Sequence, residues 1–222
     1  MKTLAALALT LAAVGAQADV VLTNTFNGSG ISPLAYPDTT TYGEVFTTPD
    51  AINTVLDSFS LIVRSQNGNT SYLYAGVATW VNGGAGTPLF TSSEFSGHFD
   101  DWQEIDIGTG GIALTPGQQY VAYFSTASLP AGNNASLEMG LSNDTNTLGF
   151  AYDNAGGGSP LHANWAGCQA NCNTQVAGTL EFSAPIQQVP EPTSVALLGL
   201  GLLGAGVARR RSQAKTHEPE LT

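Results

Sequence analysis

Basic side chains are almost missing between residues 19 and 188. This stretch contains no lysine, and Arg64 is its single arginine, against fourteen aspartates and glutamates, which gives a formal net charge of −13. Such a surface repels phosphate backbones and anionic lipid headgroups, so nucleic acids and acidic membrane surfaces are poor partners. The charge is typical of a secreted protein that stays soluble through self-repulsion.

Cysteine is also scarce, because Cys168 and Cys172 are the only two in the chain. A disulfide between them would close a small loop and stabilise it modestly. It is the favoured prediction, with two free thiols as the first alternative. A zinc site is the second alternative. It would need further ligands, and only His162 lies nearby in the sequence.

The usual signals of nucleophilic catalysis are absent. His98 and His162 are the only histidines between residues 19 and 188, and no Gly-x-Ser-x-Gly elbow occurs in the sequence. We therefore expect a noncatalytic domain with no cofactor, apart from the calcium considered below.

The N-terminus has the pattern of a signal peptide. Lys2 supplies a positive charge, residues 4–14 form an uncharged and mostly apolar run, and Ala16-Gln17-Ala18 has the small-x-small pattern of a cleavage site. We expect signal peptidase to remove residues 1–18, so that the mature chain begins at Asp19.

The C-terminal region combines three features. Pro190-Glu191-Pro192 comes first, residues 195–208 follow without a charge, and Arg209, Arg210 and Arg211 come next. As a helix, the uncharged run spans about 21 Å, short of a hydrocarbon core of about 30 Å. The arginines would stay on the cytoplasmic side. This pattern predicts a marginal anchor with a fixed orientation.

Residues 189–211 resemble the PEP-CTERM sorting domain, on the Pro-Glu-Pro motif, the apolar run and the arginine cluster. The resemblance implies recognition and cleavage by an exosortase, a membrane peptidase, after a transient stay in the inner membrane. It also implies release to the cell envelope or the extracellular space. An ordinary permanent anchor is the alternative.

Short apolar, β-branched runs between turn signals predict an all-β domain. Asn82-Gly83-Gly84 and Thr115-Pro116-Gly117 are two of the predicted turns. The expected strands are 19–26, 42–47, 54–64, 71–81, 103–107, 119–126, 137–141, 148–152 and 175–182. They favour a jelly-roll-like β-sandwich over residues 19–184. A linker at 185–194, a transmembrane segment with its arginines at 195–211 and a cytoplasmic tail at 212–222 would follow. The stretches 56–60, 74–80 and 114–121 resemble parts of a globular domain common in PEP-CTERM proteins. This resemblance spans roughly residues 40–126 and implies a β-sandwich without known catalytic residues.

An acidic cluster and several aromatic side chains are the candidate sites. Carboxylates at a strand end can hold calcium, although charge at a strand edge more often prevents edge-to-edge pairing. A pair of carboxylates could also cut a glycosidic bond, which makes a secreted polysaccharide hydrolase the alternative function. The acidic candidates are Asp100, Asp101, Glu104 and Asp106.

Flat aromatic faces beside hydrogen-bonding groups suit sugar recognition. The aromatic candidates are the three tryptophans 80, 102 and 165 and the tyrosines Tyr72, Tyr74 and Tyr152. Trp165 is the best placed, because it lies in a predicted loop with His162 and Asn164. Trp80 and Trp102 lie in predicted strands, where core packing is the favoured reading. The sequence therefore predicts an exported envelope or matrix protein that binds polysaccharide, with a purely structural surface protein as a further alternative.

Overall fold

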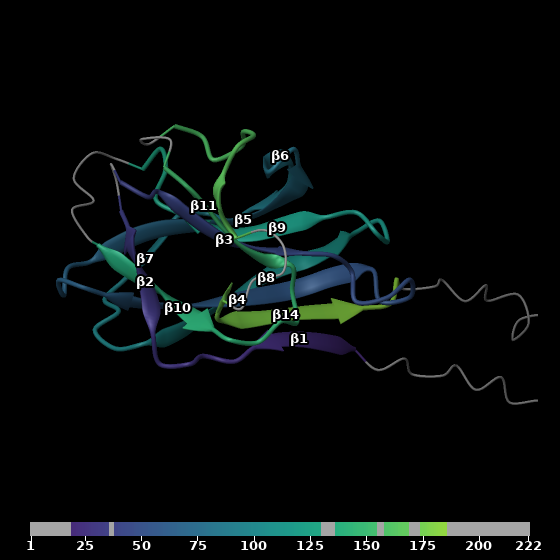
Figure 1. Ribbon diagram of the computed structural model, residues 1–222, viewed down its shortest axis with the longest axis horizontal. Coiled ribbons are helices and arrows are strands. Elements are labelled where there is room, and N and C mark those ends of the chain that lie inside the picture. Colours follow the sequence, from purple (N-terminus) through teal and green to yellow (C-terminus); the bar gives the residue numbers. More distant parts are fainter. Residues whose placement is uncertain (1–18, 36–37, 130–135, 155–157, 169–173, 186–222) are drawn as a thin grey trace, which may run out of the picture. The chain divides into compact units, whose positions relative to one another are not determined.

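The computed structural model in Figure 1 describes residues 19–35, 38–129, 136–154, 158–168 and 174–185. The chain divides into two units, residues 1–185 and 186–222, and the fold below is that of the first. The predicted signal peptide and the predicted transmembrane segment lie outside the described residues. Within the residues that the structure describes, no helix has the length and apolar character needed to cross a membrane.

Two antiparallel sheets make up the domain, so the all-β prediction is confirmed. The first sheet contains β1 (Val20–Asn24), β2 (Gly30–Leu34), β4 (Val55–Ser65), β8 (Gln103–Ala113), β10 (Leu137–Ser142), β13 (Gln175–Val176) and β14 (Gly178–Ser183). The second sheet contains β3 (Thr41–Phe46), β5 (Ser71–Val81), β6 (Gly84–Thr91), β7 (Phe95–Gly97), β9 (Tyr120–Ser125), β11 (Gly149–Asp153) and β12 (Ala166–Cys168).

The two sheets lie face to face, as Figure 1 shows, and enclose the main hydrophobic core. In the first sheet, β4 pairs with β8 on one side and with β10 and β14 on the other. In the second, β9 lies between β3 and β5. Aromatic rings meet across the interior: Phe59 lies 6.1 Å from Phe124, and Phe46 lies 5.9 Å from Phe182, between ring centroids.

A register shift in β4 changes which side chains reach this core. Strict alternation predicts that Val55 faces the interior with Phe59, and that Leu56 faces outward. The pairing of β4 with β8 shifts between Leu56 and Ser58, and the structure buries Leu56 completely while Val55 is partly exposed. A β-bulge reverses the alternation in this way, because it inserts one extra residue on one strand.

The turn predicted at Asn82-Gly83-Gly84 joins β5 to β6. Asn82 and Gly83 have φ angles of 53° and 72°. Two successive positive φ values are what the tight hairpin turns require, and Asn and Gly tolerate them best. β6 itself was not among the predicted strands, since its Gly, Thr and Pro residues do not alternate with apolar ones. β2, β7 and β12 were missed for the same lack of pattern.

The second sheet also carries apolar side chains on the face that points away from the main core. Val45, Ala78, Val121 and Ala151 lie on this face together with Trp80 and Tyr123. The segment 158–165 covers them with Leu161 and Trp165. The second sheet is therefore buried on both sides, which explains why all six residues of β3 and all six of β9 are buried.

Candidate functional site

Trp165 occupies the small outer core rather than the surface. Its side chain is only 4% exposed, and its ring lies 5.6 Å from Trp80 and 5.9 Å from Tyr123. The indole Nε1 donates to the Pro160 carbonyl at 2.9 Å, and the Trp165 amide donates to Gly83 O at 2.8 Å. The Trp165 ring therefore exposes almost no face for sugar stacking, and glycan binding at this residue stays a prediction. A tryptophan in a loop was read as exposed because the sheet face that it covers is not visible in the sequence.

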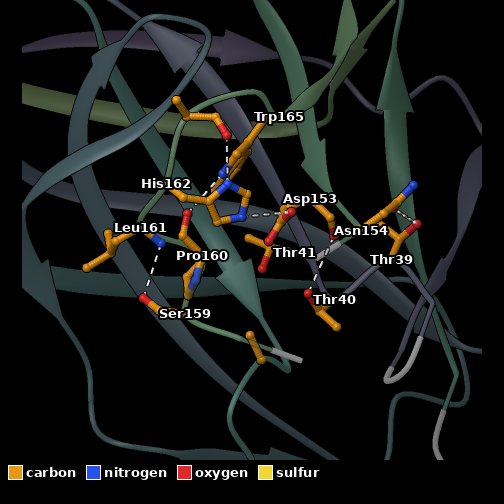
Figure 2. Close-up of polar contacts among 12 residues, drawn as sticks. Thr39, Thr40, Thr41, Asp153, Asn154, Ser159, Pro160, Leu161, His162 and Trp165 are labelled. Atoms are coloured by element: carbon orange, nitrogen blue, oxygen red, sulfur yellow. Dashed lines mark hydrogen bonds and ion pairs between the residues drawn. The ribbon is translucent and has the colours of Figure 1, made fainter. Parts of the chain in front are cut away.

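His162 lies three residues before Trp165 and contacts the end of β11. Its Nε2 is 3.0 Å from Asp153 Oδ1, and its Nδ1 is 2.7 Å from the carbonyl oxygen of Ala163 (Figure 2). Both neighbours are acceptors, so the doubly protonated ring satisfies both. The hydrogen bond to the Ala163 carbonyl raises the pKa of His162, partial burial lowers it, and the Asp153 carboxylate raises it again, so that the pKa lies above its ordinary value.

This pair differs from a nucleophile-activating dyad. In a Ser-His-Asp arrangement, the second ring nitrogen faces a hydroxyl group whose proton it accepts. Here the second nitrogen of His162 faces the Ala163 carbonyl instead. The arrangement orients the 158–165 segment against β11, and offers no activated hydroxyl at this position.

Threonines of the segment 39–41, at the start of β3, hold Asp153 and Asn154 in place. The Asp153 carbonyl accepts from the Thr40 amide at 3.0 Å and from the Thr40 hydroxyl at 3.4 Å. Thr39 Oγ1 donates to Asn154 Oδ1 at 2.6 Å, and Figure 2 shows both hydroxyl contacts. Thr41 Oγ1 lies 2.7 Å from Ser125 Oγ. Asp153 was not predicted as a site residue, since nothing in the sequence links it with His162.

An open hollow adjoins this segment on the outer face of the second sheet. Its volume is about 340 Å³. Tyr74 and Tyr123 of the sheet form its aromatic part, and the segment contributes Pro160 and Leu161. Ala127 and Leu129 add apolar surface, and the polar residues of the lining are Thr91, Ser92, Glu94, Ser128 and Ser159. Tyr74 was one of the aromatic candidates of the sequence, but the polar members were not foreseen because they come from three separate loops or strands.

Tyr74 is the one partly exposed aromatic ring in the hollow, since Tyr123 is only 1% exposed. Burial raises the pKa of Tyr74, and a hydrogen bond with Ser125 lowers it. The Asp153 carboxylate raises the pKa further. Tyr74 is therefore neutral at physiological pH and presents an uncharged ring edge and hydroxyl group.

The predicted acidic cluster is spread over an exposed strand. Asp100, Asp101, Glu104 and Asp106 are all exposed, on β8 and on the residues just before it. Glu104 Oε1 accepts from the hydroxyl group of Ser60. Across the described ranges, no three His, Cys, Asp or Glu side chains gather closely enough to hold a metal ion.

The remaining predicted residues are placed as follows. Asn164 is exposed and has a φ of 69°, next to the buried Trp165. Trp102 packs beneath Arg64, whose guanidinium carbon lies 4.5 Å from the ring centroid. Cys168 ends β12, while Cys172 lies outside the described residues, so the disulfide stays a prediction. The Pro-Glu-Pro motif and the three arginines also lie outside the described residues.

The comparison with protein families decides the reading of the C-terminal region. The family model of the PEP-CTERM protein-sorting motif matches residues 188–212. The chain carries a PEP-CTERM motif. This range contains Pro190, Glu191, Pro192 and the arginines 209–211 on which the resemblance was based. The PEP-CTERM motif makes the chain an exported protein targeted to an exosortase and directed to the cell envelope.

Several solved structures are similar to the chain that bears the PEP-CTERM motif. The cysteine protease and lectin-like domains of Cwp84, a surface layer associated protein of Clostridium difficile, share 13% identity over 67% of this chain and 32% of that chain, with a TM-score of 0.43. This chain therefore spans about a third of the Cwp84 chain that it matches.

Two carbohydrate-binding modules are also similar. The CBM36-1 domain of a multidomain xylanase from the hindgut metagenome of Trinervitermes trinervoides shares 13% identity, covering 55% of this chain and 93% of that chain, with a TM-score of 0.33. A carbohydrate-binding module CBM36 in complex with calcium and xylotriose shares 9% identity, covering 56% and 96%, with a TM-score of 0.31. No curated protein matches the chain.

Proposed function

We propose that the exported β-sandwich is a noncatalytic module that binds a neutral polysaccharide of the envelope or matrix. The observation that carries the proposal is the hollow on the outer face of the second sheet. It combines a partly exposed aromatic ring, Tyr74, with hydroxyl and carboxylate groups from Ser92, Glu94 and Ser159. A sugar ring offers an apolar face and a rim of hydroxyl groups, and this combination complements both.

The charge of the domain selects among polysaccharides. Residues 19–188 carry one arginine against fourteen acidic side chains, and Glu94 adds a carboxylate to the hollow itself. Acidic glycans would be repelled by this field. A carboxylate that accepts hydrogen bonds from sugar hydroxyl groups favours a neutral glycan.

Binding of neutral oligosaccharides to the full-length chain tests the proposal. We expect a glycan array to give binding to neutral oligosaccharides that titration calorimetry reproduces. Tyr74→Ala should weaken the affinity about tenfold, because it removes the ring that a sugar would contact. Glu94→Gln, at an exposed position, should weaken it with little effect on the melting temperature.

Tyr72→Ala is the matched control. Tyr72 precedes Tyr74 by two residues on the same face of β5, is 41% exposed and does not line the hollow. We expect this variant to bind with unchanged affinity. Equal losses in Tyr72→Ala and Tyr74→Ala, or unchanged affinity in both Tyr74→Ala and Glu94→Gln, would contradict the proposed site. Release of reducing ends from a bound polysaccharide would instead favour the hydrolase.

A further inference from the structure

A carboxylic acid group lies buried between the two sheets, away from the hollow. Glu44, in the middle of β3, is 3% exposed and points toward the first sheet, as its neighbours Tyr42 and Phe46 do. Its Oε2 accepts from the amide of Val176 at 2.9 Å, and its Oε1 contacts the hydroxyl group of Thr147. Glu44 therefore connects the second sheet to β13 of the first.

No basic side chain balances a charge on Glu44 within the part of the chain that the structure describes. The ion pairs formed there are those of Arg64 with Glu138 and of His162 with Asp153, and neither includes Glu44. The two hydrogen bonds of the carboxyl group come from an amide and a hydroxyl group, which carry no charge. An ionised Glu44 would therefore be a buried charge without a counterion.

The titratable groups of the elements around Glu44 do not supply a positive charge either. β1 and β13 contain no titratable residue. The nearest elements otherwise contribute only tyrosines and acids: Tyr42 on β3, Tyr120 on β9, Asp144 after β10, Glu104 on β8 and Glu181 on β14. Negative charges at these positions oppose the ionisation of a neighbouring carboxyl group.

Burial therefore favours the protonated form of Glu44. Transfer of an ionised carboxylate into the interior without a cation is so unfavourable that such a group takes up a proton instead. Burial accordingly raises the pKa of Glu44 well above its ordinary value, and the hydrogen bonds with Thr147 and Val176 lower it only in part. The folded protein holds a neutral carboxylic acid between its sheets.

The polar contacts around a protonated Glu44 use one proton each. Asn24 Nδ2 donates to Thr147 Oγ1 at 2.9 Å, and Gln175 Oε1 lies 3.2 Å from the same hydroxyl oxygen. With the Gln175 amide oriented as in the structure, Glu44 donates to Thr147, and Thr147 donates its own proton to Gln175. An ionised Glu44 would take the Thr147 proton instead, so the contact between Thr147 and Gln175 would lose it.

Four separate parts of the chain meet at this carboxyl group. Asn24 ends β1, Thr147 precedes β11, and Val176 lies in β13. β13 has only two residues and pairs with the end of β10. The bond from the Val176 amide to Glu44 therefore attaches this short strand to the opposite sheet.

We propose that Glu44 is a pH-sensitive lock between the two sheets, which holds while its carboxyl group is protonated and weakens once the proton is lost. In the locked state the acid contacts Thr147 and Val176 as described above. Ionisation leaves a bare charge in the interior, and the side chain must then turn away from β13 or draw in water. The lock lies outside the hollow and does not depend on the proposed sugar binding.

A small cavity beside the carboxyl group limits how far water can relieve that charge. Asn24, Glu44, Thr147 and Val176 line it, together with residues of β1, β4, β9 and β14. Its volume is about 10 Å³, which is room for about one water molecule. One water hydrates a carboxylate far less than bulk solvent does, so ionisation favours separation of β13 and the end of β1 from β3.

The direction of the pH dependence follows from the raised pKa of folded Glu44. In the unfolded chain, a glutamate releases its proton near its ordinary value of 4.5. Below that pH both states are protonated, and the lock contributes fully to stability. As the pH rises, the unfolded state alone has lost the proton, so the contribution decreases and is lost at the folded pKa. The lock is therefore strongest in acidic surroundings.

Infrared difference spectroscopy of the full-length chain tests the protonation. At neutral pH, the parent minus Glu44→Gln should show the carbonyl band of a neutral carboxylic acid, which an ionised carboxylate lacks. Glu104→Gln, at an exposed position on β8, is the control and should leave this band in place. Absence of the band from the parent would overturn the proposal.

Urea denaturation from about pH 5 to about pH 9 measures the strength of the lock. The amide of Glu44→Gln mimics the protonated acid at every pH. The unfolding constant of the parent, divided by that of Glu44→Gln, should rise about tenfold per pH unit until the folded pKa is reached. His162 is present in both proteins and cancels. A ratio that is independent of pH would refute the lock, and a ratio that falls would show that folded Glu44 is ionised.

Hydrogen exchange at the Val176 amide locates the lock, because this amide donates to Glu44. Its protection factor should decrease with pH more steeply in the parent than in Glu44→Gln. The amides of β9, whose ladders with β3 and β5 do not involve the carboxyl group, should be equally protected in both proteins. Equal protection of Val176 in the parent and the variant at all pH values would contradict the assignment.

Discussion

The two faces of the second sheet differ in how they are covered. The inner face packs against a whole sheet, and its core includes Phe46, Phe59 and Phe124 with almost no exposure. The outer face is covered by one short segment, residues 158–165, through Leu161 and Trp165. The inner face has neighbours from many strands, while the outer face depends on a few contacts.

The two faces should therefore differ in how much they contribute to the stability of the domain and in how easily they open to solvent. Removal of a side chain from the inner core leaves a cavity that two hydrogen-bonded sheets cannot collapse to fill. The outer segment can separate from the sheet without opening either ladder, because it is attached through the hydrogen bond from Trp165 to Gly83, the contact of His162 with Asp153 and the rings of Trp80, Tyr123 and Trp165. Local opening therefore needs less free energy there than global unfolding does.

The largest expected effect is on the inner face. Phe59→Ala should lower the free energy of unfolding by about 3–5 kcal/mol, because the ring is 1% exposed and meets Phe124 across the interior. Urea denaturation should show one cooperative transition at a lower midpoint. Val21→Ala, at a side chain that is 52% exposed, serves as the control and should stay within about 0.5 kcal/mol of the parent. A loss below 1 kcal/mol in Phe59→Ala would contradict the placement of the main core.

Trp165→Ala should have the next largest effect. We expect a loss of about 3 kcal/mol, at the lower end for a buried tryptophan, because its cluster is small and lies under a segment that can relax. Near-ultraviolet circular dichroism should lose the signal of the perpendicular Trp80–Trp165 pair. An unchanged free energy of unfolding would return Trp165 to the surface and restore it as a sugar-binding candidate.

Gly84→Ala tests how the segment 158–165 covers the outer face without removing an aromatic ring. A Cβ atom at Gly84 would lie 2.1 Å from the carbonyl oxygen of His162, so the 158–165 segment must move away. We expect a loss of about 1–3 kcal/mol and a weakened Trp80–Trp165 signal, with the inner core intact. Retention of the full dichroic signal would show that the segment does not lie against β6.

The smallest effect concerns His162 and pH. Since its folded pKa is raised above the unfolded value of about 6.5, its contribution to stability is fully present below that pH. The contribution disappears as the pH rises through the folded pKa. The side chain is 35% exposed, so screening should keep the effect below about 1 kcal/mol.

His162→Gln should flatten this part of the pH profile. Urea denaturation at a series of pH values measures the free energy of unfolding, and an NMR titration of the ring measures the pKa of His162 in the folded protein. We expect the difference in free energy of unfolding between the parent and the variant to fall above pH 6.5. A difference that rises instead would contradict the predicted direction of the pH dependence.

The strands with alternating apolar residues could be predicted from the sequence, and so could two turns. β4, β5 and β9 coincide closely with their predicted ranges, whereas the predicted strand 175–182 is divided into β13 and β14. Gly117, with a φ of 78°, lies in the predicted Thr115-Pro116-Gly117 turn. The bulge that brings Leu56 inside could not be predicted, because register depends on the partner strand.

The sites were harder to predict than the strands. Trp165 was read correctly as a loop residue, but its burial depends on an outer sheet face that no local pattern reveals. Glu44 was not singled out at all, because a single glutamate within a strand resembles a solvent-facing residue. Only the fold shows that Asn24, Thr147 and Gln175 meet it from distant parts of the chain. The sorting motif was readable because it is contiguous in sequence.

The position of β14 determines how the domain carries mechanical load. β14 is the last strand before the sorting motif, and it lies between β1 and β4 rather than at the edge of its sheet (Figure 1). Tension applied through the chain after Ser183 acts along this strand, so the hydrogen bonds to both neighbours bear the force together, in shear. An edge strand that is pulled in the same direction would share the force with one neighbour only. While the chain is held by its C-terminal region, a pull on the domain meets two ladders at once.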